Sequence, residues 1–228
     1  MPGLLPVVSP HQPVYRIGRQ PDPWSPPDWS RALPDRTFGN RFDDSAGQFR
    51  VLYAGSSRLA CFMETLAPFR KAPNLEAQLA AISDNEVEPD LVIGGTVPAS
   101  WLSIRRMGMA SVGGQRFADI YSSEWLAYLR PRFEVELIDR GVIEAGSDFD
   151  LSLIMRKDRS LTQRIATLVY SLEYDGIFYL SRYGNDLLNW AIFEPFDLEE
   201  QASSEIQIDD PDFREALRRL NLQLDPHH

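Results

Sequence analysis

A short strand that runs directly into a helix constrains the fold of this chain more than any other stretch of its sequence. Residues 50–55, RVLYAG, are mostly apolar and are bounded by Gly47 and Gly55, which predicts a strand. Ser56 or Ser57 can cap the helix that follows, and Pro68 stops that helix at about Ala67. Its apolar side chains recur at helical spacing and form one stripe: Leu59, Phe62, Met63 and Leu66. The sequence therefore predicts a strand and helix packed against the core.

One acidic residue, Glu64, interrupts this apolar helix. It lies opposite the apolar stripe, where a side chain normally faces solvent, but its neighbours there are Ala60 and Cys61. An unpaired buried carboxylate is costly and rare. Two interpretations stay open: Glu64 is a half-desolvated functional acid in a cleft, which we favour, or a surface acid on a core helix.

Histidine and cysteine usage excludes several kinds of site. The histidines are His11, His227 and His228, all near the termini. A catalytic unit built on histidine and a typical zinc site are therefore not expected, and we predict no metal. Cys61 is the only cysteine, which excludes an intramolecular disulfide and favours a packing role. Chemistry must rely on carboxylates, arginines, tyrosines and serines.

Charge and hydropathy argue against nucleic-acid and membrane binding. The formal net charge of −10 does not suit a protein that contacts nucleic acid or anionic lipid directly. Residues 197–228 carry −6 of it, which indicates a solvated acidic face or, as the alternative, a contact for a basic partner. The sequence shows no signal peptide and no apolar run long enough to span a bilayer, so a cytoplasmic location is the default expectation.

The length of 228 residues predicts one main domain with two appendages. We expect a flexible arm over 1–12, the domain over 13–196, and an acidic extension over 197–228 that contains one helix. Strands and helices alternate without regular βαβ spacing and without a GxGxxG turn. This favours an α+β class over a Rossmann fold.

The remaining elements follow from local patterns. The expected strands are 13–18, 50–55, 91–98, 134–139, 175–181 and 189–196. Further helices are expected over 122–131, closed by Pro131, and over 161–172, begun by a capping box of Ser160 and Gln163. A last helix begins at Asp210 and Pro211 and buries Phe213, Leu217 and Leu220. Residues 20–40 are rich in proline and predict an irregular segment, and 107–117 predict a mobile glycine-rich loop.

Five pieces of sequence, in order, resemble the RES domain family, named for arginine, glutamate and serine. They read NRF with Arg41, VLY with Tyr53, LACFME with Glu64, LTQRIA at 161–166, and DGIFYLSR with Ser181 and Arg182. The resemblance extends from about Tyr15 to Phe193. The sequence departs from the family pattern at Asp43 and Asp44, and residues 98–122 have no evident counterpart.

The resemblance implies an ADP-ribosyltransferase-like fold, in which split antiparallel sheets grip a dinucleotide. Members of the family are typically toxins of toxin–antitoxin pairs that degrade NAD⁺ by hydrolysis or phosphorolysis. NAD⁺ would then be a substrate, with inorganic phosphate as co-substrate in the second case and no resident cofactor. The implied partner is a helix-turn-helix antitoxin that covers the active site, and a homodimer is a further option.

The resemblance also gives roles to single residues. Glu64 would stabilise the positive charge that develops on the ribose, and Arg41 would hold the pyrophosphate with its planar guanidinium. The alternative is that Arg41 is an ordinary loop arginine that pairs with Asp43 or Asp44, and without the motif we would favour it. Tyr53 would stack on nicotinamide or bind a phosphate, unless it is an ordinary core tyrosine.

The later motif supplies the other candidates. Ser181 would bind the ribose or a phosphate, although a serine at a strand end is often a turn former. Arg182, and more weakly Arg16, are further candidates for phosphate. Arg105 and Arg106 either guard the entrance or form a solvated pair, which is the simpler interpretation.

Two other functions stay open. A mono-ADP-ribosyltransferase would break the same bond and transfer the product to a macromolecule. A carboxylate two residues before Glu64, placed to position an acceptor, would support this function. This chain has Phe62 there, which argues against it. A non-catalytic RES-like module that only binds a partner is the third possibility, and its support is the unusual pair of Asp43 and Asp44.

Overall fold

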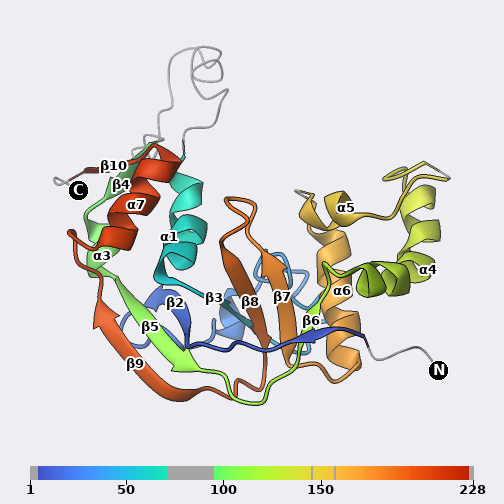
Figure 1. Cartoon of the computed structure of the whole chain (residues 1–228), viewed down its shortest axis with the longest axis horizontal. Helices are drawn as coiled ribbons and strands as arrows, with labels where there is room; N and C mark the ends of the chain where they lie inside the picture. The colour runs from blue at the N-terminus through green and yellow to red at the C-terminus, as the bar shows by residue number, and fades with distance from the viewer. Residues whose placement is uncertain (1–4, 71–94, 145, 157, 226–228) are drawn as a thin grey trace, which may run out of the picture.

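A computed structural model describes residues 5–70, 95–144, 146–156 and 158–225. These residues form a curved sheet with helices at both of its ends (Figure 1). The strands are β1 (Val7–Val8), β2 (Val14–Arg19), β3 (Val51–Gly55), β4 (Thr96–Pro98), β5 (Arg105–Ser111), β6 (Phe117–Asp119), β7 (Gly176–Leu180), β8 (Leu188–Phe193), β9 (Glu199–Glu205) and β10 (Gln223–Asp225). The helices are α1 (Arg58–Leu66), α3 (Ser100–Ser103), α4 (Ser123–Asp139), α5 (Leu151–Met155), α6 (Ser160–Ser171) and α7 (Pro211–Leu220), with 3₁₀ turns η1 (Trp29–Arg31) and η2 (Ala67–Phe69).

The large sheet is nearly split in its middle. Its strand order is β1-β6-β7-β8-β3-β2-β5-β9, and a separate small sheet pairs β10 with β4. β3 meets β2 through one residue pair, Tyr15 with Gly55, whereas β3 runs alongside β8 for its full length. Neighbouring strands of the large sheet are antiparallel except for β6 and β7. The expected α+β class is confirmed, and the two halves of the split sheet are β1-β6-β7-β8-β3 and β2-β5-β9.

Arg16 joins these two halves where the ladder opens. Its Nη1 donates to the carbonyl of Tyr53 in β3 at 2.9 Å, and its Nε donates to the carbonyl of Pro23 at 2.8 Å. Burial of the guanidinium lowers the pKa of Arg16 to about 10, with nearby acidic groups partly offsetting that effect. The side chain therefore supplies hydrogen bonds that the strands themselves do not make there.

Two groups of helices stand on either side of β7 and β8 (Figure 1). On one side α1 packs against α7, with the rings of Phe62 and Phe213 5.5 Å apart. On the other side α4, α5 and α6 cover the second core around Trp125 and Ile165. A cleft between these groups is therefore bordered by elements from distant parts of the sequence.

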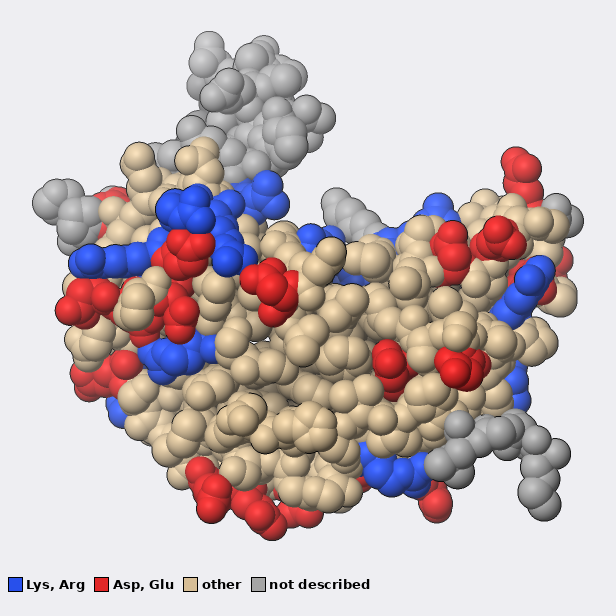
Figure 2. Space-filling view, in the orientation of Figure 1, with Lys and Arg blue, Asp and Glu red and all other residues tan. Residues whose placement is uncertain are grey.

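The described parts of both expected appendages contribute to this architecture. β1 pairs with β6, and Trp125 Nε1 donates to the carbonyl of Pro6 at 2.9 Å. In the acidic segment β9 lies at the sheet edge with every residue exposed, and α7 is part of the core. Figure 2 shows acidic side chains gathered along the lower edge of the molecule, where the chain runs into β9.

The expected strand at 134–139 is wrong, because α4 continues through Pro131 to Asp139. Leu129, Phe133 and Leu137 are buried at intervals of four, which is helical spacing, while Val135 is 69% exposed. The exposed Pro131 lies on the solvent side of the helix. The apparent alternation of polar and apolar residues in this stretch was therefore misleading.

The expected loop at 107–117 is also wrong at its two ends, because β5 spans Arg105–Ser111 and β6 begins at Phe117. Gly108 serves close packing here, since a Cβ atom at this position would lie 2.6 Å from Trp24 Nε1. The expected strand at 91–98 is described only from residue 95 and contains β4; residues 91–94 lie outside the described residues.

The expected helix at 161–172 is confirmed as α6, but its capping box is wrong. The backbone N–H of Ser160 donates to Asp158 Oδ1 at 3.0 Å, and the Ser160 hydroxyl donates to Asp158 Oδ2 at 3.0 Å. Gln163 Nε2 instead donates to the carbonyl of Asn40 at 3.0 Å. Gln163 thus ties the helix to the loop that carries Arg41.

The last helix begins at Asp210 and Pro211 as expected. Asp210 Oδ1 accepts the backbone N–H groups of Asp212 and Phe213, and Asp210 Oδ2 accepts from the Arg58 guanidinium at the start of α1. Phe213 and Leu220 are buried. Asp210 therefore connects the two helices on this side of the cleft.

We expect Asp210→Ala to lower the free energy of unfolding by about 2 kcal/mol, from loss of the cap and of a partly buried ion pair. Urea denaturation measures this change. Asp209→Ala, at an exposed neighbouring position, is the matched control and should change stability by less than about 0.5 kcal/mol. Equal effects of the two substitutions would contradict the assigned role of Asp210.

Candidate active site

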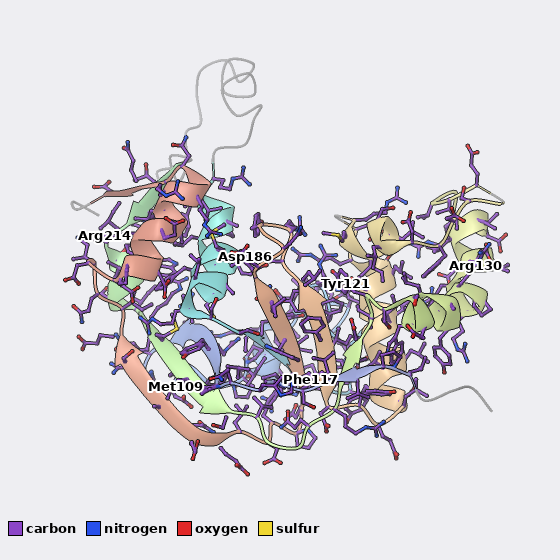
Figure 3. All side chains as sticks on the ribbon, viewed as in Figure 1. Met109, Phe117, Tyr121, Arg130, Asp186 and Arg214 are labelled. Carbon is purple, nitrogen blue, oxygen red and sulfur yellow. The ribbon has the colours of Figure 1, made fainter. Side chains whose placement is uncertain are left out.

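A cavity of about 380 Å³ opens between the two groups of helices. Its lining comes from loops, α1, α5, the middle of β3, the turn after β6 and the end of β7: Asn40, Arg41, Tyr53, Glu64, Thr65, Pro68, Tyr121, Met155, Arg159, Tyr179, Leu180, Arg182 and Tyr183. Figure 3 labels Tyr121, which follows β6 and approaches the cavity beside β7. Of the predicted site residues, Arg41, Tyr53, Glu64 and Arg182 line this cavity directly.

Glu64 is held in the cavity wall by two side chains from other elements. Its Oε1 accepts from Ser181 Oγ at 2.6 Å and from Asn189 Nδ2 at 3.2 Å. Ser57 caps the start of α1 by accepting from the N–H of Ala60, so Glu64 lies in the second turn of a short, fixed helix. Within the described part of the chain, no hydrogen bond reaches Oε2. The interpretation of Glu64 as a surface acid is therefore wrong, and one of its carboxylate oxygens is left for a ligand.

Ser181 positions Glu64. Its side chain is only 3% exposed, and its Oγ accepts the N–H of Tyr183 at 3.0 Å while donating to Glu64. The serine therefore forms the turn after β7 and orients the carboxylate at the same time. Asn189 in β8, which is also buried, was not predicted; its polar side chain inside an apolar strand was the available signal.

We expect Ser181→Ala to reduce turnover at this site about tenfold, because Glu64 loses one charge-assisted hydrogen bond but keeps the bond from Asn189. The measurement is kcat with the substrate that is proposed in the next section. Ser171→Ala on the outer side of α6 is the control. Wild-type kcat in Ser181→Ala would show that the hydroxyl serves only the turn.

Arg41 reaches across to the other group of helices. Its Nη1 donates to the carbonyls of Ile154, at 2.5 Å, and Arg156, at 3.2 Å. The alternative pairing with Asp43 or Asp44 is wrong, because both carboxylates accept backbone N–H groups of their own loop. These two aspartates thus build the loop, and Arg41 has no ion pair among the residues that the structure describes.

Three guanidinium groups gather on the cavity, from Arg41, Arg159 and Arg182. Burial lowers the pKa of Arg41, and repulsion from Arg182 and Arg159 lowers it further. Among the described residues that line this cavity, Glu64 is the single carboxylate. The site therefore offers one negative group and a strongly positive surface beside it, which suits an anionic ligand. Arg159 was not predicted; its signal was a cation two residues before the LTQRIA motif.

Tyr53 supports the loop of Arg41. Its hydroxyl accepts from the N–H of Phe42 at 2.9 Å and donates to Asp43 Oδ1 at 3.2 Å. Burial, with repulsion from Asp43, raises the pKa of Tyr53 well above its usual value, so the phenol stays protonated. The ring borders the cavity while the hydroxyl is engaged elsewhere, which leaves stacking as the contact open to it.

Tyr179 and Tyr121 also border the cavity and were not predicted. Burial is the main cause that raises the pKa of each, and the negative charge of Glu64 contributes to both shifts. Both phenols therefore remain neutral near the carboxylate. They provide aromatic surface on which a flat ring can rest.

The remaining candidates lie beside the cavity. Arg16 borders a smaller space of about 80 Å³ that it shares with Glu64, but two of its nitrogens are engaged with carbonyl groups. Cys61 Sγ donates to the carbonyl of Tyr15, and burial raises the pKa of the thiol to about 12, in keeping with a packing role. Arg106 Nε lies 3.4 Å from Ser203 Oγ, and Arg105 lies over the ring of Trp101.

Metal binding and membrane crossing find no support in the described residues. No group of three or more histidine, cysteine, aspartate or glutamate side chains there could hold a metal ion. None of the helices in these residues has both the length and the apolar character needed to cross a bilayer.

The model of the RES domain matches residues 13–214. The chain belongs to the RES domain family. A chain in the crystal structure of the M. tuberculosis MbcT–MbcA toxin–antitoxin complex has a similar fold, with a TM-score of 0.50 and 16% sequence identity, over 94% of this chain and 91% of that chain. No curated protein matches the sequence. The fold of this RES protein is thus the ADP-ribosyltransferase-like arrangement that its motifs implied.

Proposed function

We propose that this RES protein cleaves the nicotinamide–ribose bond of NAD⁺. The observation that carries the proposal is Glu64, held by Ser181 and Asn189, in one cavity with three arginines. In this arrangement Glu64 faces the nicotinamide ribose, and Arg41, Arg159 and Arg182 bind the pyrophosphate. The membership in the RES family supports this choice of substrate.

The chemistry needs no histidine. As the bond between ribose C1′ and the nicotinamide nitrogen breaks, its electron pair leaves with nicotinamide, which departs as a neutral base. Positive charge develops on the ribose, as in glycoside hydrolysis, and the Glu64 carboxylate stabilises it. Water then adds to C1′ and loses a proton to give ADP-ribose, or inorganic phosphate adds instead and gives the 1-phosphate.

Transfer of ADP-ribose to a macromolecule is the weaker alternative. Phe62, two residues before Glu64, is fully buried and packs on Phe213 on the far side of α1. It offers no group to position an acceptor at the cavity. The non-catalytic alternative loses its support as well, because Asp43 and Asp44 stabilise the loop that presents Arg41.

We further propose that the protein acts as the toxin of a toxin–antitoxin pair. The support is the similar fold of a chain in the MbcT–MbcA complex, together with the family. The inhibitor in this proposal is an antitoxin protein with a helix-turn-helix domain, which covers the cavity. Co-expression with the neighbouring gene product should relieve any growth defect that the protein causes, and persistence of the defect with every neighbour would contradict the pairing.

The enzymatic proposal is tested by incubating the purified protein with NAD⁺, with and without inorganic phosphate, and separating the products. Nicotinamide should appear together with ADP-ribose, or with its 1-phosphate only when phosphate is present. Labelled NAD⁺ added with a cell lysate distinguishes transfer from both. No nicotinamide under any of these conditions would overturn the proposal.

A further inference from the structure

A second cavity, of about 570 Å³, also borders Tyr53, and Glu64 is not among the described residues that line it. Its walls come from the end of β2, the proline-rich segment, η1 and the first residue of β5. It shares Asn40 and Tyr53 with the candidate active site. A ligand longer than the active-site cavity can therefore extend from one space toward the other.

Positive charge dominates this second cavity. In the part of the chain that the structure describes, four arginines line it, against two aspartates. Asp22 accepts from the N–H of Trp24 and from Ser25 Oγ, and Asp28 accepts from the N–H of Ser30. Both carboxylates therefore stabilise turns of the proline-rich segment, and neither lies within ion-pair distance of an arginine among the described residues.

Three of the four guanidinium groups are free to meet a ligand. Arg16 is engaged with two carbonyls, but the side chains of Arg19 and Arg31 have no hydrogen bond or ion pair with any group that the structure describes. Arg105 rests on the ring of Trp101, 4.8 Å from its centre. Arg19 and Arg105 are directly opposite in neighbouring strands, and burial together with this like charge lowers the pKa of Arg105. Such a concentration of cations is stabilised by a bound anion.

The rest of the wall suits a nucleoside. Phe38, Val51, Pro26 and Pro27 supply aromatic and apolar surface, and Asn40 supplies an amide at the boundary between the two cavities. Asn40, next to Arg41 in the chain, borders both cavities, so a dinucleotide with its pyrophosphate at the active-site arginines can place its adenosine half in the second cavity. The adenosine of NAD⁺ carries no charge for Arg19, Arg31 and Arg105 to bind.

We propose that the second cavity binds the 2′-phosphate on the adenosine half of NADP⁺, so that the protein prefers 2′-phosphorylated dinucleotides. This inference rests on the proposed function for the direction in which the dinucleotide lies. A phosphate monoester adds a charge of about −1.5 to −2 at neutral pH and three acceptor oxygens. It thereby supplies the negative charge that these arginines can bind and that the adenosine of NAD⁺ lacks.

The test compares two ligands that differ by this single phosphate, ADP-ribose and 2′-phospho-ADP-ribose. Neither contains the bond to be cleaved, so calorimetric affinity is independent of turnover. We expect the phosphorylated ligand to bind at least about tenfold more tightly, the gain of one or two charge-assisted hydrogen bonds. Arg19→Gln combined with Arg31→Gln should erase this preference and leave the affinity for ADP-ribose unchanged. Arg132→Gln, at an exposed site on α4, should retain it.

Several results would overturn the inference. They are equal affinities of the two ligands for the wild-type protein, a preference that survives the double substitution, and no binding of either ligand. A further arm titrates inorganic phosphate alone. If phosphate binds the wild-type protein but not the double variant, while the 2′-phosphate brings no gain, the cavity takes free phosphate and the inference is wrong. A clear preference without cleavage of NAD⁺ or NADP⁺ would retain the inference and overturn only the proposed function.

Discussion

Replacing Glu64 by glutamine is expected to lower kcat for nicotinamide release roughly 10³-fold, with little change in KM. The glutamine side chain keeps the shape of the glutamate, and its amide oxygen can still accept from Ser181 and Asn189. The negative charge beside the ribose is what the substitution removes. Because that charge acts on the transition state, its loss should appear in kcat.

The same variant should remain folded. Glu64 is half-buried and has no ion pair among the described residues, so the melting temperature should shift by no more than a few degrees. Glu205→Gln, at an exposed position in β9, is the matched control and should keep full activity. Wild-type turnover in Glu64→Gln would remove Glu64 from the chemistry.

Replacing Arg41 by alanine is expected to lower kcat/KM about 10²-fold, because a bidentate contact between guanidinium and phosphate is lost. Arg41→Lys keeps the charge but not the planar fork, so it should recover about tenfold of this loss. The affinity for ADP-ribose should fall in parallel, whereas inhibition by free nicotinamide should not change. These readouts separate phosphate binding from a general disturbance of the loop.

Arg41 also donates to the carbonyls of Ile154 and Arg156, so its alanine variant should lose about 1 kcal/mol of stability as well. Arg132→Ala on α4 is the control for surface charge. If Arg41→Ala and Arg132→Ala bind ADP-ribose equally well, Arg41 does not contact the phosphates.

Local patterns were sufficient to predict the elements that carry the site. β3 and α1 follow from an apolar run, a serine cap and Pro68, and these fix Glu64 within its helix. β7 and β8 follow from their continuous apolar residues. The motifs around Arg41, Glu64 and Ser181 were enough to expect them in one place, because their order matched a known family.

Long-range packing decided what local patterns could not show. The residues 134–139 alternate like a strand, but burial of Phe133 and Leu137 on one side keeps them in α4. Gly108 suggested flexibility, but the space beside it is filled by Trp24, which is far away in sequence. Neither interaction can be predicted from the residues that are adjacent in the sequence.

The site residues that the sequence did not predict also depend on long-range packing. Arg159, directly before α6, lines the cavity across from α1, and Asn189 in β8 donates to Glu64 of α1. Both depend on how distant elements fold together. Asp43 is an atypical neighbour for Arg41 in the motif, yet it bonds the hydroxyl of Tyr53 and two loop amides. Its role depends on a strand ten residues later in the chain, which a motif does not reveal.

The most direct test of Glu64 as the group beside the reacting ribose is a crystal structure of the Glu64→Gln variant with intact NAD⁺ bound. We expect the nicotinamide ribose in contact with residue 64 and the pyrophosphate in contact with Arg41 and Arg182. A dinucleotide bound in the opposite direction, or outside the cavity between α1 and α6, would contradict this arrangement.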